Sequence, residues 1–181
     1  MTPESNQRSL QWWVLYTKPR AEKKAFEALN KQGYHVYLPC VTVVKQWSDR
    51  KKKVREPLFR SYLFIYCKEN HIFLAAQDNT IVGIVRFEGR PAVVRDREIE
   101  TIRRIEAGHE DIAVVDSTLV TGQEVLIKSG TLKGVFGILT EFRGTRRVAI
   151  QIESLGCNLL VEVSAGNITK LPSKTKKTYT G

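Results

Sequence analysis

Hydrophobic and polar positions along the first hundred residues follow a strand period, which two stretches of helical period interrupt. The run Trp12–Thr17 is rich in aromatic and branched side chains and predicts a strand. After Pro19, apolar residues recur at positions 21, 25, 28 and 29, as on one face of a helix that ends at Gly33. Isoleucines at positions 99, 102 and 105 predict another helix, capped by Asp96.

Further strand patterns lie between these two helices. Residues 34–47 predict a long strand with a bend or an edge at Pro39, and residues 60–67 and 81–87 predict two more strands. A short helix is expected over 70–76. In the strand 60–67, side chains at 63 and 65 point to one face and the aromatics Tyr62, Phe64 and Tyr66 to the other. These elements predict an α/β sandwich with a mainly antiparallel sheet.

The hydrophobic pattern changes after residue 107, from alternating strands and helices to strands alone. The segment 107–118 carries the acids Glu110, Asp111 and Asp116 and no base, and it lacks a sustained period, which is typical of a linker. Beyond it, five short strand patterns are separated by glycines and predict a small antiparallel β-barrel. We therefore expect an α+β protein with an N-terminal domain over 10–107, a linker over 108–118, a barrel over 119–171 and a disordered tail over 172–181.

The composition favours a soluble protein with a surface for polyanions. Hydrophobic residues make up 42% of the 181 residues, and no apolar run approaches the roughly 20 residues that span a bilayer. The N-terminus lacks a secretory signal, so we expect a cytoplasmic protein. The net charge is +10, and residues 1–107 contribute +8 of it, from 20 Lys/Arg against 12 Asp/Glu. Such a surface attracts phosphate polyanions.

Residues with reactive or metal-binding side chains are scattered. The three cysteines and three histidines form neither a disulfide framework nor a metal-binding spacing. The acids are dispersed, and no glycine-rich phosphate loop is present. A nuclease would need clustered carboxylates, and a hydrolase a nucleophile with a base. We therefore expect no enzymatic activity, no bound metal and no cofactor.

Basic residues gather at two places in the N-terminal domain. One group lies at the start of the predicted first helix and comprises Lys18, Arg20, Lys23 and Lys24. The other group follows the long strand and comprises Arg50, Lys51, Lys52 and Lys53, with Arg55 close behind. A charge run of this kind is either a solvated hairpin tip or a surface for nucleic-acid phosphates.

Four motifs occur in an order that resembles one known family. They are WVLYTKPRAEKKAFEALNKQGYHVYLP, EPLFRSYLFI, VRFEGRPAVV and GQEVLIKSGTLKGVFGILTEF. Together they resemble the NusG family of transcription elongation factors over residues 12–171, with a KOW module as the second domain. The EPLF and VRF segments are nearer to the specialised RfaH-like paralogs and capsule-locus antiterminators. The chain departs from the family where Arg60 and Ser61 replace the usual Pro-Gly, and where Phe73, Leu74 and Ala75 replace a His-Thr-Thr cluster.

The resemblance implies a function and a set of contacts. Family members bind the two clamp helices of the largest subunit of RNA polymerase and suppress pausing or termination. For this chain, the resemblance to the specialised paralogs implies suppression at specific operons such as surface-polysaccharide loci. By position, the polymerase-binding apolar patch comprises Tyr16, Phe59, Tyr62, Phe64 and Phe87. The two basic groups would contact upstream or non-template DNA. The KOW domain would bind ribosomal protein S10 or Rho. The chain would act as a monomer and would not bind a membrane.

Three features of the sequence have more than one interpretation. Taken alone, the aromatic face of 60–67 is either part of the core or a partner surface with anchoring side chains. Glu56 either pairs with Arg146 or Arg147 of the second domain, as in RfaH, or is an ordinary surface residue. RSYLFIYC also echoes an RNA-recognition octamer, so the alternative function is an RNA-binding module, either of RRM type or a ribosomal KOW protein.

Overall fold

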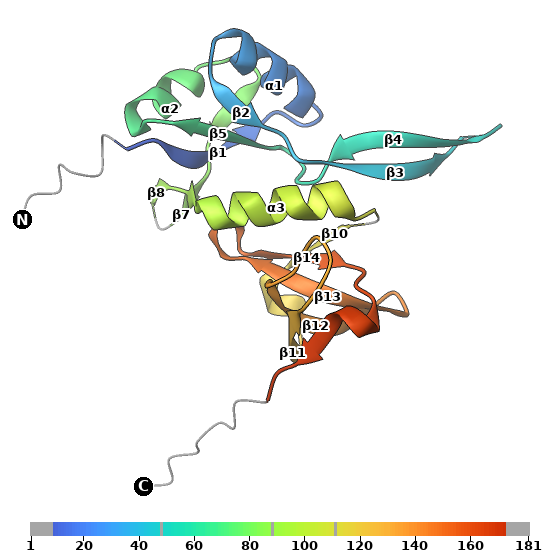
Figure 1. Cartoon of the computed structure of the whole chain (residues 1–181). Helices are drawn as coiled ribbons and strands as arrows, with labels where there is room; N and C mark the ends of the chain where they lie inside the picture. Colours follow the sequence, from blue (N-terminus) through green and yellow to red (C-terminus); the bar gives the residue numbers. More distant parts are fainter. Residues whose placement is uncertain (1–8, 48, 88, 111, 173–181) are drawn as a thin grey trace, which may run out of the picture. The chain divides into compact units, whose positions relative to one another are not determined.

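The computed structural model describes residues 9–47, 49–87, 89–110 and 112–172 (Figure 1). The chain divides into two compact units, Met1–Asp111 and Ile112–Gly181, and this division falls inside the expected linker. Within the described ranges, no helix is both long and apolar enough to cross a membrane. The part of the expected tail from residue 173 onward lies outside the described residues.

The first unit is built on an antiparallel sheet whose central strand is β1 (Gln11–Thr17). The order is β2-β5-β1-β6, with the short strand β9 also paired to β1. The bounds of these partners are His35–Tyr37 for β2, Tyr62–Cys67 for β5, Ile81–Ile84 for β6 and Val93–Val94 for β9. The long strand expected over 34–47 is broken at Leu38 and Pro39, because proline cannot donate to a sheet ladder.

Helices cover both faces of this sheet, as a sandwich requires. α1 (Glu22–Lys31) and α2 (Glu69–Ala75) lie on one face and α3 (Asp96–Gly108) on the other (Figure 1). The alternation of β5 directs Leu63 and Ile65 into the core cluster that contains the apolar residues of α1 and α2. α3 buries its isoleucines at positions 99, 102 and 105, as their three-residue spacing predicted. It is preceded by Arg95 as its N-cap, whose N–H donates to Glu98, so Asp96 is the first helical residue rather than the expected cap.

Two separate hairpins complete the first unit. β3 (Cys40–Gln46) pairs with β4 (Lys51–Pro57), and β7 (Arg86–Phe87) pairs with β8 (Arg90–Pro91). The basic run that could have been a hairpin tip is therefore largely the strand β4 itself. Figure 1 shows the β3–β4 hairpin extending away from the sheet.

The second unit is one antiparallel sheet in the order β10-β14-β13-β12-β11-β15. The five expected strands are present as β11 (Gln123–Ile127), β12 (Phe136–Phe142), β13 (Thr145–Ile152), β14 (Cys157–Val161) and β15 (Ile168–Lys170). The sheet has a sixth strand, β10 (Ala113–Asp116), which was expected to be linker but pairs with β14. Short 3-10 turns occupy Ser117–Leu119, Glu153–Leu155 and Ala165–Asn167.

Candidate functional site

Two tyrosines form an exposed aromatic pair on neighbouring strands of the first unit. Tyr16 of β1 lies directly opposite Tyr62 of β5, and their ring centroids are 5.9 Å apart in an edge-to-face arrangement. Tyr16 is 42% exposed and Tyr62 is half-buried. An aromatic side chain that stays this exposed beside another is available to a partner protein.

Two other residues of the expected apolar patch lie inside the protein. Phe64 has no exposed surface and Phe59 is 5% exposed, with their ring centroids 5.7 Å apart. Phe64 also packs against Tyr37, at 6.0 Å between ring centroids. These two rings are therefore part of the interior, and in this structure they do not form an exposed surface. The alternative that the strand aromatics are core holds for Phe59 and Phe64 and does not hold for Tyr16.

Phe87 is the most exposed of the expected contact residues, at 71%. It lies in β7, directly after β6. Because β6 runs antiparallel to β1, with Ile84 opposite Leu15, the chain at Phe87 has moved towards the beginning of β1 and away from Tyr16. The five expected contact residues therefore do not form one exposed patch. Tyr16 and Tyr62 form a pair at the surface, and Phe87 is exposed at a separate place.

The turn beside the tyrosine pair is held by a buried carboxylate. Ser61 has a φ of 60°, a left-handed conformation that non-glycine residues rarely adopt. Its N–H donates to Glu22 Oε1 at 2.8 Å, and its carbonyl accepts from the Thr17 N–H at 2.8 Å. Glu22 is 7% exposed. These bonds hold the turn where the usual Pro-Gly is absent, and they leave Arg60 exposed at its rim.

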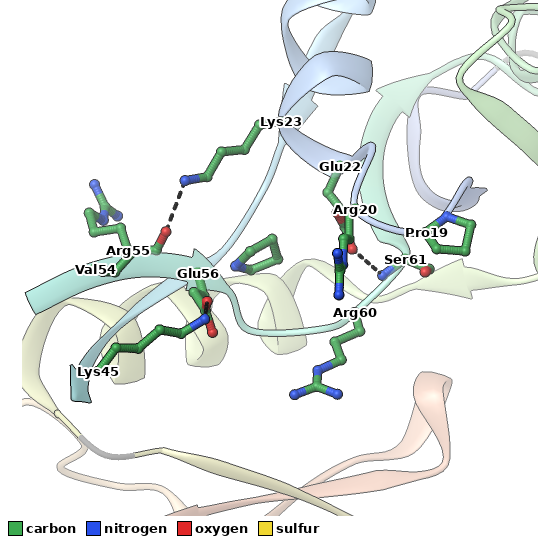
Figure 2. A pocket seen from close by; sticks show the side chains of 11 residues that line it. Pro19, Arg20, Glu22, Lys23, Lys45, Val54, Arg55, Glu56, Arg60 and Ser61 are labelled. Carbon is green, nitrogen blue, oxygen red and sulfur yellow. Dashed lines mark hydrogen bonds and ion pairs between the residues drawn. The ribbon is translucent and has the colours of Figure 1, made fainter. Parts of the chain in front are cut away.

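A basic groove lies next to this turn, between the start of α1 and the base of the β3–β4 hairpin (Figure 2). Its volume is about 750 Å³. The residues that line it are Pro19, Arg20, Glu22, Lys23, Lys45, Val54, Arg55, Glu56, Pro57, Arg60 and Ser61. Five cations face two carboxylates here, so the groove is suited to an anionic ligand.

Most of the charges in the groove already have partners. Lys45 forms an ion pair with Glu56, and Lys23 Nζ donates to the Arg55 carbonyl at 2.9 Å (Figure 2). The Arg55 guanidinium donates to Glu106 Oε1 at 2.8 Å. Among the described residues, Arg20 and Arg60 make no ion pair. These two cations therefore dominate the field of the groove.

The structure separates the two basic groups that the sequence indicated. Arg20 and Lys23 line the groove, whereas Lys18 and Lys24 do not. Lys24 instead lies near Asp78, whose pKa is lowered first by hydrogen bonds from Thr80 and to a smaller extent by the charge of Lys24. The cations Arg50, Lys51, Lys52 and Lys53 continue outward along the hairpin and are all exposed.

Two of the three residues expected to join the domains have a side-chain partner within their own unit. Glu56 pairs with Lys45, and Arg147 lies 3.9 Å from Glu162 with its guanidinium over the Phe142 ring. Arg147 is buried, whereas Arg146 is exposed. A pair between Glu56 and either arginine therefore remains a prediction.

Glu106 is a residue of the site region that the sequence pattern did not reveal. Its carboxylate accepts from Tyr37 Oη at 2.8 Å, from the Cys40 N–H at 3.1 Å and from Arg55. Burial, followed by the bond to Glu106, raises the pKa of Tyr37 above its usual range. The carboxylate thus connects α3, the β2–β3 break and β4. The only sequence signal for this role is that Glu106 is an acidic residue near the end of the predicted helix.

Two alternative chemistries find little support in the described part of the chain. No group of three or more His, Cys, Asp or Glu residues there could hold a metal ion. An RNA-recognition module stacks bases on the aromatic face of its sheet. Here that face carries the fully buried Phe64 and is covered by α3 (Figure 1), so Phe64 is not available for stacking.

Comparisons with known proteins agree with this architecture. The solved structure "Domain interaction in Thermotoga maritima NusG" matches at a TM-score of 0.56 and 21% identity, over 91% of this chain and 98% of that one. "Crystal Structure of MjSpt4:Spt5 complex conformation B" matches at a TM-score of 0.30 and 13% identity, over 88% and 96% of the two chains, which is too distant to support an argument. Residues 10–103 match the family described as "Transcription termination factor nusG". The chain therefore belongs to the NusG family of transcription factors.

Proposed function

We propose that this chain is a transcription elongation factor that docks on the clamp helices of the largest subunit of RNA polymerase and suppresses pausing or termination. The observation that carries the docking proposal is the exposed Tyr16–Tyr62 pair, with ring centroids 5.9 Å apart. Membership of the NusG family supports a role in transcription. The similarity of the motifs to RfaH-like paralogs supports action at specific operons, such as surface-polysaccharide loci.

The tyrosine pair has the properties of an anchoring contact. Tyrosine is enriched among the residues that carry binding energy, because it buries a large area with few rotatable bonds. The edge-to-face packing orients the two rings against each other before a partner arrives. Arg20 and Arg60 lie at the rim and would steer an acidic partner surface by charge complementarity.

The second unit would recruit a further partner. By the resemblance to a KOW module, this partner is ribosomal protein S10 or Rho. Phe136 at the beginning of β12 is 64% exposed, and Lys128 and Lys133 are exposed on the same unit. These residues offer an aromatic anchor with nearby cations. The role of the basic hairpin, in this proposal, is contact with upstream or non-template DNA.

Retention of the chain on RNA polymerase tests the docking surface. Tyr16→Ala and Tyr62→Ala should each reduce co-purification with polymerase, and the double variant should abolish it. Val44→Ala is the matched control, because Val44 is 60% exposed and lies in β3 of the hairpin, outside the sheet that carries the tyrosine pair. Unchanged retention of the double variant, with its fold intact, would remove the docking proposal. Transcription assays on templates with and without a leader pause site would then separate a general factor from an operon-specific one.

A further inference from the structure

The connection between the two units is short, because a strand takes up part of the segment that the sequence predicted to be linker. β10 (Ala113–Asp116) pairs with β14 in the sheet of the second unit. Four residues therefore separate Gly108, at the end of α3, from the first residue of β10. One of them, Glu110, lies 3.4 Å from Lys53 of the first unit. The length of free chain between the units thus depends on whether β10 stays paired.

β10 contributes little to the interior of the second unit. It lies at the end of the strand order and, among the described strands, pairs with β14 alone. None of its four residues is buried, and Val114 is 40% exposed. All five residues of β14, in contrast, are buried. A segment with few buried apolar contacts opens at a lower free energy than the rest of its sheet.

The chain that follows β10 is fixed to the sheet again at Gly122. A Cβ at Gly122 would collide with the Leu139 carbonyl oxygen of β12, so the backbone packs directly on that strand. β11, which comes next, pairs on both sides, with β12 and β15. Asp116 accepts hydrogen bonds from the Thr118 N–H at 2.8 Å and from its hydroxyl at 2.6 Å, but both bonds lie within the segment. Residues 113–121, which we call the strap, can therefore leave β14 without disturbing β11.

We propose that the strap is releasable and that its release sets how far the second unit can reach from the first. A chain extends by at most about 3.5 Å per residue. The connection from Gly108 therefore spans at most about 17 Å to a paired β10, and about 50 Å to Gly122 once the strap is released. A partner that lies beyond the shorter span binds the released state alone and shifts the equilibrium towards it. The inference goes beyond the proposed function and does not depend on which partners the two units bind.

Hydrogen exchange of the full chain, followed by NMR, tests the release directly. Protection factors of the β10 amides should be at least about tenfold lower than those of β13, which lies in the middle of the same sheet. Exchange of β10 should also depend little on denaturant, because a local opening exposes little surface. If β10 and β13 are equally protected, β10 leaves only when the whole unit unfolds, and the proposal is overturned.

The strand register offers a matched pair of proline variants. The Ser117 N–H donates to the Gly156 carbonyl at 3.2 Å, and hydrogen-bonded pairs alternate with non-hydrogen-bonded pairs along an antiparallel ladder. The N–H of Val115 therefore points to β14, and that of Val114 points away from the sheet. Proline removes the N–H, so only Val115→Pro should break the pairing.

Small-angle X-ray scattering of these variants measures the reach of the chain. Val115→Pro should increase the maximum dimension by on the order of 10 Å, while the amides of β12 and β13 stay protected from exchange. Val114→Pro should leave both quantities unchanged. Unfolding of the second unit in Val115→Pro, or equal maximum dimensions of the two variants, would overturn the proposal.

A native cysteine allows the strap to be locked. Asp116 lies opposite Cys157 in a non-hydrogen-bonded pair, where Cα atoms are about 4.5 Å apart and a disulfide can form. Asp116→Cys treated with oxidised glutathione should form this bridge, which peptide mapping identifies, and β10 should then exchange as slowly as β13. The reduced form of the same variant, and Asp116→Ser with or without oxidant, should keep the fast exchange. Fast exchange of β10 in the bridged form would show that it does not arise from release of the strap, and would overturn the proposal.

Discussion

Glu22 accepts a hydrogen bond from the backbone N–H of Ser61 at 2.8 Å, from a position in the first turn of α1. The bond joins the helix to the turn that precedes β5. It also compensates for the φ of 60° at Ser61, which places a Cβ in a conformation usually left to glycine. The Tyr16–Tyr62 pair and the basic groove meet at this turn, so its geometry bears on both surfaces.

Removal of the Glu22 carboxylate should destabilise the first unit. Glu22→Ala leaves the Ser61 N–H without its acceptor, which costs about 1–3 kcal/mol of the free energy of unfolding. Glu22→Gln keeps a carbonyl acceptor at the same position and should cost less. Denaturant unfolding followed by tryptophan fluorescence measures this, because all three tryptophans lie in the first unit. Equal stability of Glu22→Ala and the unchanged chain would show that the bond contributes nothing.

Replacement of Ser61 by glycine should have the opposite effect. Ser61→Gly removes the Cβ from a left-handed position, where the cost is about 1–2 kcal/mol, and this gain is partly offset by the greater freedom of glycine in the unfolded chain. We expect a net stabilisation of up to about 1 kcal/mol. Ser61→Ala retains the Cβ and is the control, which should not gain stability. A loss of stability in Ser61→Gly would contradict the strain argument.

Periodicity alone located most elements, because local patterns determine them. The helical stripe of α3 and the alternation of β5 each correspond to a buried face in the structure. The strand β10 was missed because its alternating residues follow an acidic stretch, and only pairing with β14 shows that they belong to the sheet. Burial of Phe64 and exposure of Tyr16 depend on where α3 lies across the sheet, which no short-range pattern contains.

The carboxylate of Glu106 should determine how firmly the hairpin is held to the rest of the unit. Glu106→Ala removes the acceptor of Tyr37, Cys40 and Arg55 together, and we expect a loss of about 1–3 kcal/mol in the free energy of unfolding. Hydrogen exchange in β3 and β4 should also become faster. Tyr37→Phe removes one of these bonds and is the graded comparison, with a smaller loss. Unaltered exchange in both strands of Glu106→Ala would argue against this role.

Burial should make Cys67 an unreactive thiol. Its side chain lies in the core cluster, and burial raises its pKa to about 11. At pH 8 the thiolate fraction is then about a thousandth, compared with about a quarter in an unfolded chain. Alkylation followed by mass spectrometry should label Cys67 far more slowly in the folded chain than in denaturant. Because the folded pKa is the higher one, the thiol lowers stability as the pH rises above the unfolded value. Equally fast labelling in both states would show that the thiol is accessible.

Close packing at Gly137 should make the second unit intolerant of a side chain there. A Cβ at this position would lie 2.5 Å from Val148 Cγ1 and 2.8 Å from the Ala149 carbonyl oxygen, and the backbone oxygen has little room to move. Gly137→Ala should therefore separate β12 from β13 and cost about 1–3 kcal/mol, as overpacking does. Gly166→Ala is the matched control in the same unit, because a Cβ there meets nothing within 4 Å. Hydrogen exchange of the β12 and β13 amides gives the readout, since the tryptophan signal of the first unit should not change. If Gly137→Ala exchanges as slowly as Gly166→Ala, the two strands are less tightly packed than their register indicates.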